Sequence, residues 1–273
     1  MDSTPPDPSK QAELDELRRA MDEADDAILD ALARRAAIAK RVGTLRRDES
    51  QVYLPRRERD QLARIEARGA GLFPKRALGP VFREIWSASL ALEAPLRVAY
   101  EGPLGSVSHE AARKRFGASA AYLPCEGARA SLQLVEREHA DVAVVLLESA
   151  AEGLMQPALE ALGDSELKVV DEVPLEVRIH LLNHSGNMQA IDKVFAAPAE
   201  RTACARFLST NLPKAQVLDA RTSATAAESA AADPNAAALG GSAVGEAFGL
   251  SIARGNVADE AGEQLRCVVL GAR

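Results

Sequence analysis

A long stripe of apolar residues in the first 45 positions constrains this chain more than any other feature. Taken in alternating steps of three and four, the stripe continues for more than four heptads, which is typical of a helix packed along its whole length. Its positions are Leu14, Leu17, Met21, Ala24, Ile28, Ala31, Arg35, Ile38, Val42 and Leu45. Pro8 follows the N-cap candidate Asp7, so we expect one helix from there to about Arg47.

This helix is too long to bury its stripe alone. About 40 residues at 1.5 Å per residue give a rod of roughly 60 Å. The sequence predicts two shorter helices to pack against it, one from Pro55 to Gly69 and one within residues 74–94. We also expect a second copy of the chain to cover the rest of the stripe, and therefore a homodimer.

Charged and polar residues interrupt these apolar faces. Arg35 lies in the stripe itself, while Ser89 interrupts the third helix with Glu93 one turn further on. The other arginines on or beside the stripes are Arg18, Arg46 and Arg57. An unpaired charge in a core costs several kcal/mol, so each buried arginine needs a carboxylate.

Two sources of carboxylate are open. The first is a salt bridge within the bundle, with Asp22, Asp25 or Glu58 as the partner. The second is an external anion with at least two carboxylates, which guanidinium groups bind in a planar, bidentate way. Because the arginines outnumber the acids near the stripes, the second interpretation is favoured.

The sequence pattern changes after Pro95. Short β-rich runs alternate with alanine-rich helical stretches, which predicts two α/β lobes with a cleft between them. The charge changes as well. Residues 1–95 carry 17 basic and 17 acidic side chains, whereas the rest carries 16 against 23 and therefore the whole net charge of −7.

Several classes of protein are excluded by what the sequence lacks. No apolar run approaches the roughly 18 residues of a membrane span, and the N-terminus has no signal-peptide pattern. Three scattered cysteines and four histidines show no metal-ligand spacing. We expect a cytoplasmic protein with no membrane or nucleic-acid partner, no metal and no cofactor. The stretch HEAARKRFG, which begins at His109, is interpreted as a solvated helix start.

The first part of the chain resembles a known family. The stretches LDELRRAMDEADDAILDALARRAAIAKRVG, VYLPRRERD and VFREIWSASLALE look like the all-helical, AroQ-type chorismate mutase domain, over residues 10–94. The resemblance implies an intertwined dimer that converts chorismate to prephenate, a pericyclic rearrangement without nucleophile, metal or cofactor. Catalysis then consists of holding the dicarboxylate folded and stabilising charge on the breaking ether bond.

The resemblance also assigns roles by position. Arg18 would reach into the partner's site, and Arg35 and Arg57 would hold the substrate near its carboxylates. Arg46 stands where the family usually has lysine, and Glu58 would bind the substrate hydroxyl. Ser89 and Glu93 would close the site. Leu54 replaces an aspartate that some members use.

Residues 97–271 resemble a prephenate dehydratase domain. The matching stretches include VAYEGPLGSVSHEAARKRFG, LLESAAEG, ARTSATAAESAA and AAALGGSAVGEAFGL. The resemblance implies two α/β lobes like those of periplasmic binding proteins, and domains of residues 1–95 and 96–273. The retained residues that would bind prephenate are Ser106, Ser108, Thr222, Ser223 and Arg266.

The motifs of this second domain are incomplete. Val107 replaces an aromatic residue, Ala197 and Ala199 replace the histidine and glutamine of an H-P-Q motif, and Leu265 replaces the threonine expected to take part in dehydration. Three interpretations are open: a remnant that stabilises or regulates the mutase, a slow dehydratase, or a domain turned to another reaction such as non-aromatising decarboxylation. The family usually continues into a phenylalanine-binding ACT domain, and we expect feedback through such a domain to be absent.

Overall fold

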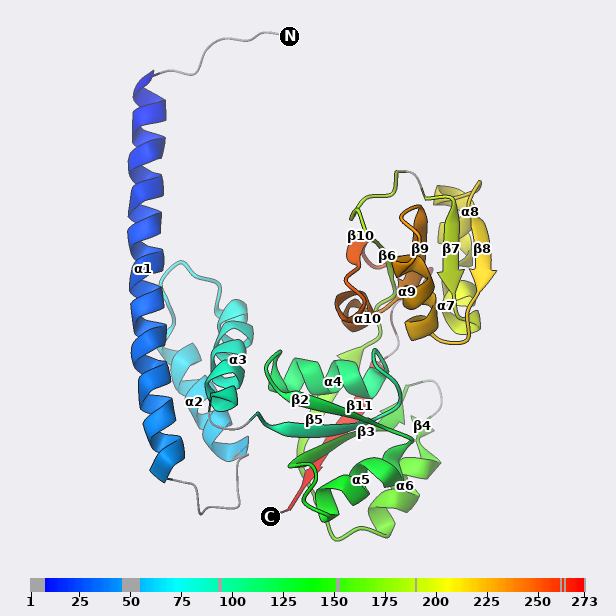
Figure 1. The fold of residues 1–273 in the computed structure, drawn as a ribbon, viewed down its shortest axis with the longest axis horizontal. Coiled ribbons are helices and arrows are strands. Elements are labelled where there is room, and N and C mark those ends of the chain that lie inside the picture. The colour runs from blue at the N-terminus through cyan, green and yellow to red at the C-terminus, as the bar shows by residue number, and fades with distance from the viewer. Residues whose placement is uncertain are drawn as a thin grey trace.

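The protein consists of a helical region followed by two α/β lobes (Figure 1). The computed structural model describes residues 8–45, 55–92, 95–150, 153–189, 191–260, 262 and 264–272. This arrangement confirms the fold class expected from the sequence. No helix within these ranges is long and apolar enough to cross a membrane.

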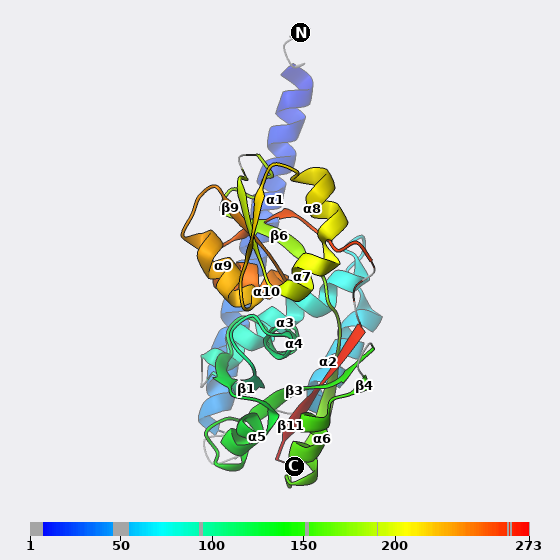
Figure 2. The ribbon, with the colours of Figure 1, turned by 90° about the vertical axis from the view of Figure 1, so that its right-hand side faces the viewer.

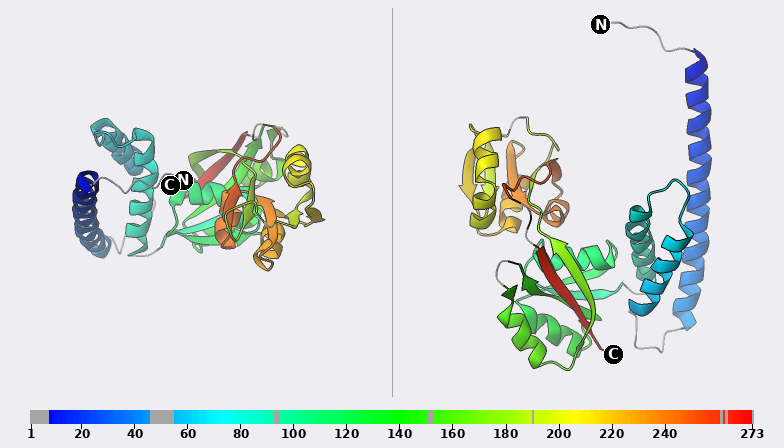
Figure 3. Two further views of the ribbon diagram at one scale, coloured as in Figure 1. Left: turned by 90° about the horizontal axis from the view of Figure 1, so that it is seen from above. Right: turned by 180° about the vertical axis from the view of Figure 1, so that it is seen from behind.

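The helical region is dominated by α1 (Pro8–Leu45), a single helix of 38 residues. The helices α2 (Pro55–Arg68) and α3 (Lys75–Ala91) follow, and α3 contacts both α1 and α2. The N-terminal part of α1 stands clear of the rest of the molecule in two opposite views (Figures 1 and 3). Every residue from 10 to 31 is exposed, including stripe positions such as Met21 at 67%. The C-terminal end of the stripe is largely uncovered as well, with Ile38 62% and Leu45 87% exposed. The half-buried residues there are Leu32, Arg35, Ala36, Ala39 and Gly43, so a single chain shields Arg35 but leaves nearly all the apolar stripe positions exposed.

The first lobe is built on a mixed sheet with strand order β2-β1-β3-β11-β5, and β4 pairs with β3. Strands β1, β2 and β3 are parallel, and β11 runs antiparallel between β3 and β5. Its elements are β1 (Arg97–Glu101), α4 (Val107–Phe116), β2 (Ala121–Cys125), α5 (Ala128–Glu136), β3 (Val142–Ser149), β4 (Gly153–Leu154), α6 (Gln156–Gly163), β5 (Lys168–Glu176) and β11 (Gln264–Gly271).

The second lobe contains a five-stranded sheet with order β10-β6-β9-β7-β8 (Figure 2). Its elements are β6 (His180–Asn183), β7 (Lys193–Ala196), α7 (Pro198–Ala203), α8 (Ala205–Asn211), β8 (Gln216–Asp219), α9 (Ser223–Ala231), β9 (Ala236–Gly240), α10 (Ser242–Ala247) and β10 (Ser251–Arg254). The chain crosses between the lobes twice, from β5 to β6 and from β10 to β11.

Both faces of each sheet are covered by helices and carry an apolar cluster. Successive side chains of a strand point to opposite faces, so one strand contributes to both clusters. In β1, Val98 and Tyr100 pack beneath α4, whereas Ala99 packs on the opposite face with Leu132 of α5. All the β-rich runs that mark the second half of the sequence form strands here. Three short strands, β2, β4 and β10, have no clear alternation of apolar and polar residues and were not predicted.

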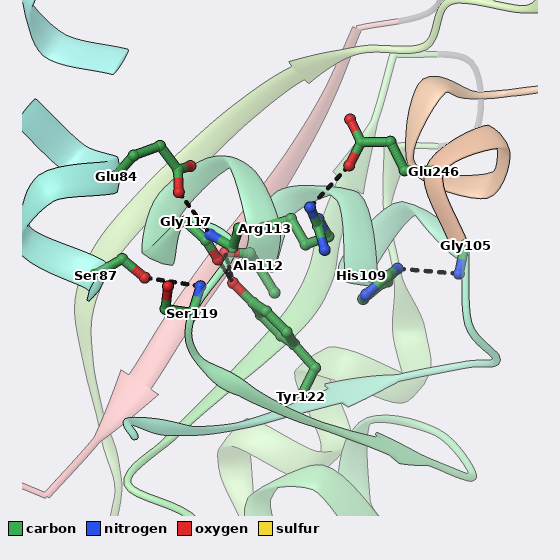
Figure 4. Close-up of polar contacts among 11 residues, drawn as sticks. Glu84, Ser87, Gly105, His109, Ala112, Arg113, Gly117, Ser119, Tyr122 and Glu246 are labelled. Atoms are coloured by element: carbon green, nitrogen blue, oxygen red, sulfur yellow. Dashed lines mark hydrogen bonds and ion pairs between the residues drawn. The ribbon is translucent and has the colours of Figure 1, made fainter. Parts of the chain in front are cut away.

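The helical region is attached to the first lobe through α3 and the loop after α4 (Figure 4). The Glu84 carboxylate accepts a hydrogen bond from the Ala118 backbone N–H at 2.9 Å, and the Ser87 hydroxyl accepts one from Ser119 N–H at 3.1 Å. Gly117 makes this approach possible. Its φ is +77°, and a Cβ there would lie 2.8 Å from the Ser87 Cβ.

We expect Gly117→Ala to destabilise the protein more than Gly127→Ala. Gly127 has a similar backbone conformation, with φ of +91°, but open space where its Cβ would be. Both substitutions strain the backbone by about 1–3 kcal/mol. Only Gly117→Ala also pushes against α3, which adds about 1–3 kcal/mol. Denaturant unfolding of the two variants measures the difference, and equal losses would show that α3 does not pack against Gly117.

Candidate functional site

The helical region brings together two of the predicted site residues, Arg35 of α1 and Ser89 of α3. Arg35 Nη1 donates to the Ser89 hydroxyl and, at 3.3 Å, to the Ile85 carbonyl. The Ser89 hydroxyl in turn donates to the same carbonyl at 2.6 Å. Burial lowers the pKa of Arg35.

Arg35 keeps most of its donor capacity in this arrangement. A guanidinium has five N–H donors, and in the described part of the chain Arg35 contacts a hydroxyl and a carbonyl through one nitrogen rather than a carboxylate. The interior salt bridge considered from the sequence is therefore not the contact formed here. The remaining N–H groups can bind a carboxylate of a ligand.

The other predicted residues of this region are dispersed. Arg18 precedes Arg35 by 17 positions on the same helix, or about 25 Å. Its side chain is 68% exposed and lies 3.1 Å from the Asp15 carboxylate. Arg57 is exposed in the first turn of α2. Arg46 and Glu93 lie outside the described residues.

Glu58 contacts the first lobe instead of Arg35. Its Oε2 lies 2.8 Å from Nη1 of Arg115 on α4, and Arg115 Nε lies 2.7 Å from the Asp171 carboxylate on β5. Arg115 was not among the residues predicted from the sequence. Its spacing from Ala111 and Ala112 places it on the buried face of α4, so the reasoning applied to Arg35 could have found it.

A cleft of about 630 Å³ separates the two lobes, as expected from the sequence. It is bounded by the segment between β1 and α4, by both crossover segments and by α7, α9 and the start of α10. Its lining residues include Gly105, Val107, Glu110, Leu175, Arg178, Ala199, Glu200, Ser223, Gly241 and Asp259.

Acidic side chains dominate the cleft. The carboxylates that line it are Glu110, Glu176, Glu200, Asp259 and Glu260. The arginine that lines it, Arg178, lies 2.8 Å from Glu176 and is neutralised by it. Burial raises the pKa of Glu110, with Lys114 lowering it and Glu246 raising it further. A dianion entering this cleft meets net negative charge.

The predicted prephenate-binding residues are mostly engaged in local structure. Ser223 lines the cleft and donates its hydroxyl hydrogen to Glu200. Ser106 caps α4, accepting from His109 N–H at 3.3 Å and donating to the Glu101 carbonyl at 2.9 Å. Thr222 caps α9, with its hydroxyl accepting from Thr225 N–H at 3.1 Å.

The remaining two lie on or beneath the first sheet. Ser108 is 2% exposed, and its hydroxyl neighbours the thiol of Cys267, whose pKa burial raises to about 12. Arg266 Nε lies 2.9 Å from the Glu148 carboxylate, and its Nη1 lies 3.6 Å from Glu172. Leu265, which occupies the position of the expected threonine, is part of the apolar core.

His109 corrects one expectation from the sequence. The start of α4 is not solvated there, because the imidazole is 3% exposed and packs against the rings of Tyr100 and Tyr122. Its Nδ1 accepts a hydrogen bond from Gly105 N–H at 3.0 Å (Figure 4). Burial lowers the pKa of His109 to about 4, with a smaller effect from Arg113. This neutral histidine holds a loop that borders the cleft.

Comparison with known proteins matches both halves of the chain. Residues 17–94 match the family described as chorismate mutase type II, and residues 98–273 match prephenate dehydratase. A bifunctional chorismate mutase/prephenate dehydratase from Aquifex aeolicus is 34% identical over 267 residues, which is 96% of this chain and 74% of that protein.

Two solved structures share the fold of the two lobes. One is described as GqqA, a novel type of quorum quenching acylase, with a TM-score of 0.55 and 23% identity over 64% of each chain. The other is a prephenate dehydratase from Arthrobacter aurescens in complex with L-Phe, with a TM-score of 0.53 and 22% identity. That match covers 64% of this chain and 60% of the other. Each match spans less than two thirds of the solved chain, and at these identities the likeness concerns the fold alone.

We expect the neutral state of His109 to make stability pH-dependent. Its pKa of about 4 in the folded protein lies below the ordinary value of 6.5, so the unfolded chain binds the extra proton between these values. The contribution of neutral His109 to the free energy of unfolding is complete above pH 6.5. It falls by about 3 kcal/mol as the pH drops to 4.

Unfolding free energies of His109→Asn measured from pH 4 to 7 test this expectation. Asparagine can accept the Gly105 hydrogen bond but does not titrate, so this part of the pH dependence should disappear. His139→Asn, at an exposed position, is the matched control and should keep the wild-type slope. The expectation is wrong if His109→Asn also keeps the wild-type slope of unfolding free energy against pH.

Proposed function

Since this chain belongs to the family of bifunctional chorismate mutase/prephenate dehydratases, we propose that it is a chorismate mutase that forms prephenate in its helical region. The single observation that carries the proposal is the contact of Arg35 with Ser89 inside the helical region. A half-buried guanidinium beside a hydroxyl, with N–H groups to spare, suits a dicarboxylate substrate. We keep the domain boundary proposed from the sequence, between residues 95 and 96.

The rearrangement of chorismate requires only that the substrate is held in its folded conformer and that the charge on the breaking ether bond is stabilised. Arg35 binds a substrate carboxylate and Ser89 fixes the orientation of the guanidinium, so the folded conformer of chorismate is held without cofactor. Arg57 of α2 would hold the other carboxylate region of the substrate, and Glu58 of the same helix would bind the substrate hydroxyl once it is released from Arg115. Arg46 and Glu93 complete the site, with a protonated Glu93 donating to the ether oxygen as charge develops there.

The proposed enzyme is a homodimer with composite sites. The exposed stripe on residues 10–31 supports a second copy as the partner, because a single chain leaves these apolar side chains in water. Arg18 lies on this uncovered part of α1, too far along the helix to join Arg35 of its own chain. It would serve the site of the partner. A cytoplasmic location fits a pathway enzyme of this kind.

We propose that the second domain has lost dehydration of prephenate or retains it only weakly. Loss of the hydroxyl needs an acid or hydrogen-bond donor, and Leu265 supplies neither. The acidic cleft repels a dianion, and the ion pairs of Arg266 and the capping contacts of Ser106 and Thr222 leave few groups to bind one. The domain then stabilises or regulates the mutase.

Incubation of the purified protein with chorismate tests both parts of this proposal. We expect prephenate to accumulate, and added prephenate to form phenylpyruvate at less than about 1 s⁻¹, the low end of ordinary turnover. Leu265→Thr alone should not restore dehydration, since other motif positions also differ. Rapid formation of phenylpyruvate would refute the loss of dehydration. A decarboxylated diene would point to a different reaction in the cleft, and no consumption of chorismate would refute the mutase.

Arg18→Ala and Arg35→Ala should each lower mutase kcat/KM by about a hundredfold or more, because each removes a charged donor from the site. Mixed dimers made by co-refolding contain one intact site, formed by Arg35 of one variant and Arg18 of the other. Random exchange should restore about a quarter of the wild-type activity. Absence of recovery, or a monomer in sedimentation at micromolar concentration, would contradict the shared site.

A further inference from the structure

An arginine of the second domain holds a predicted catalytic residue of the first. The Arg115 guanidinium lies between two carboxylates, that of Asp171 at 2.7 Å on Nε and that of Glu58 at 2.8 Å on Nη1. All three side chains are largely shielded, at 15% exposed for Arg115, 17% for Asp171 and 22% for Glu58. Charge-assisted hydrogen bonds are stronger than neutral ones, and moving one partner of a shielded pair leaves the other charge uncompensated.

The surroundings fix Arg115 on the side of the first lobe. Asp171 lies in β5, and Phe116 packs in the core beneath α4, so the base of the arginine belongs to the α/β fold. The cavity beside the pair is only about 20 Å³, room for a single water molecule. Glu58 and Arg115 line it together with Ser87 of α3 and apolar residues such as Trp86 and Leu96. Burial lowers the pKa of Arg83, and the nearby charge of Arg115 lowers it further.

Helix α3 separates this cluster from Arg35. Ser87 faces the loop after α4 and accepts the hydrogen bond from Ser119 (Figure 4). Ser89 instead faces α1 and accepts the hydrogen bond from Arg35. Two positions on a helix differ by about 200° around its axis, so these two serines mark nearly opposite faces. The Glu58 carboxylate lies on the face of Ser87, away from the Arg35 guanidinium.

We propose that Arg115 is a latch that competes with the substrate for Glu58, so that the second domain sets the affinity of the mutase site. This inference rests on the proposed mutase function. While Glu58 is paired with Arg115, its carboxylate is directed to the first lobe and a bound substrate lacks the partner for its hydroxyl. The apparent affinity is reduced by the fraction of molecules in which Glu58 is released.

The latch would also give the second domain a role if its proposed dehydration of prephenate is weak or lost. Helix α4 carries Arg115 near its C-terminal end, and Arg113 of the same helix lies 2.8 Å from Glu246 on α10 of the second lobe. Any movement of the lobes that shifts α4 therefore acts on both ion pairs.

Steady-state kinetics of Arg115→Met with chorismate test the latch. We expect KM to fall by roughly three- to tenfold with kcat unchanged, the equilibrium effect of freeing a carboxylate from one charge pair. Arg113→Met is the matched control: it removes an equally charged residue of the same helix whose partner is Glu246, and should leave KM unchanged. Arg115→Lys keeps the charge but cannot bridge two carboxylates in the same way, and should give an intermediate KM.

The outcomes separate the two proposals. If the wild-type protein does not convert chorismate, the proposed function fails and the latch with it. If the wild type is active but Arg115→Met and Arg115→Lys leave KM unchanged, only the latch is refuted. A raised KM or a lowered kcat in a variant with the wild-type unfolding temperature also refutes it, because Arg115 then supports the site. Should Arg115→Met fail to fold, the KM of Arg115→Lys decides alone.

Discussion

The packing of α4 against all three parts of the molecule is the interaction on which the rest depends. One face of the helix covers the first sheet with Ala111, Ala112 and Phe116. Arg113 and the loop before the helix contact α10, where a Cβ on Gly105 would lie 2.4 Å from Val244 Cγ2. At the other end, Arg115 pairs with Glu58 of α2, and Gly117 lies against Ser87 of α3. A helix of ten residues thus joins the helical region and both lobes.

The sequence was sufficient for features set by local chemistry. The apolar stripe predicted the length of α1, and prolines and glycines predicted where the helices begin and end. Apolar runs predicted the strands that are buried on both sides. Local patterns also singled out Arg35 and Ser89 as candidate site residues, because each interrupts an apolar helix face, although their direct contact was not predicted. Polar groups on the half-buried, facing sides of two helices have few other protein partners.

Features that depend on long-range packing could not be obtained in this way. His109 sits in a stretch rich in charged residues, and only the approach of the Tyr100 and Tyr122 rings shows that it is buried. Glu58 was assigned by family position, and nothing near it in the sequence indicates Arg115, 57 residues later. Ser106 and Thr222 kept the residue types of the family motifs, but their hydroxyls serve as helix caps. A motif comparison does not distinguish such a cap from a substrate-binding group.

The position of β11 has a consequence for how the protein is made. This final strand lies between β3 and β5, so the first sheet lacks the strand that connects them until residues 264–271 have been synthesised. The second lobe, from β6 to β10, is complete before that point and can fold earlier on the ribosome. Until then the facing edges of β3 and β5 have no strand to pair with, which exposes backbone groups to other chains. The long separation in sequence between β3 and β11 also makes their pairing slow. A truncated chain that ends before β11 would therefore keep a foldable second lobe but expose the unpaired edges of β3 and β5, and with them a route to aggregation.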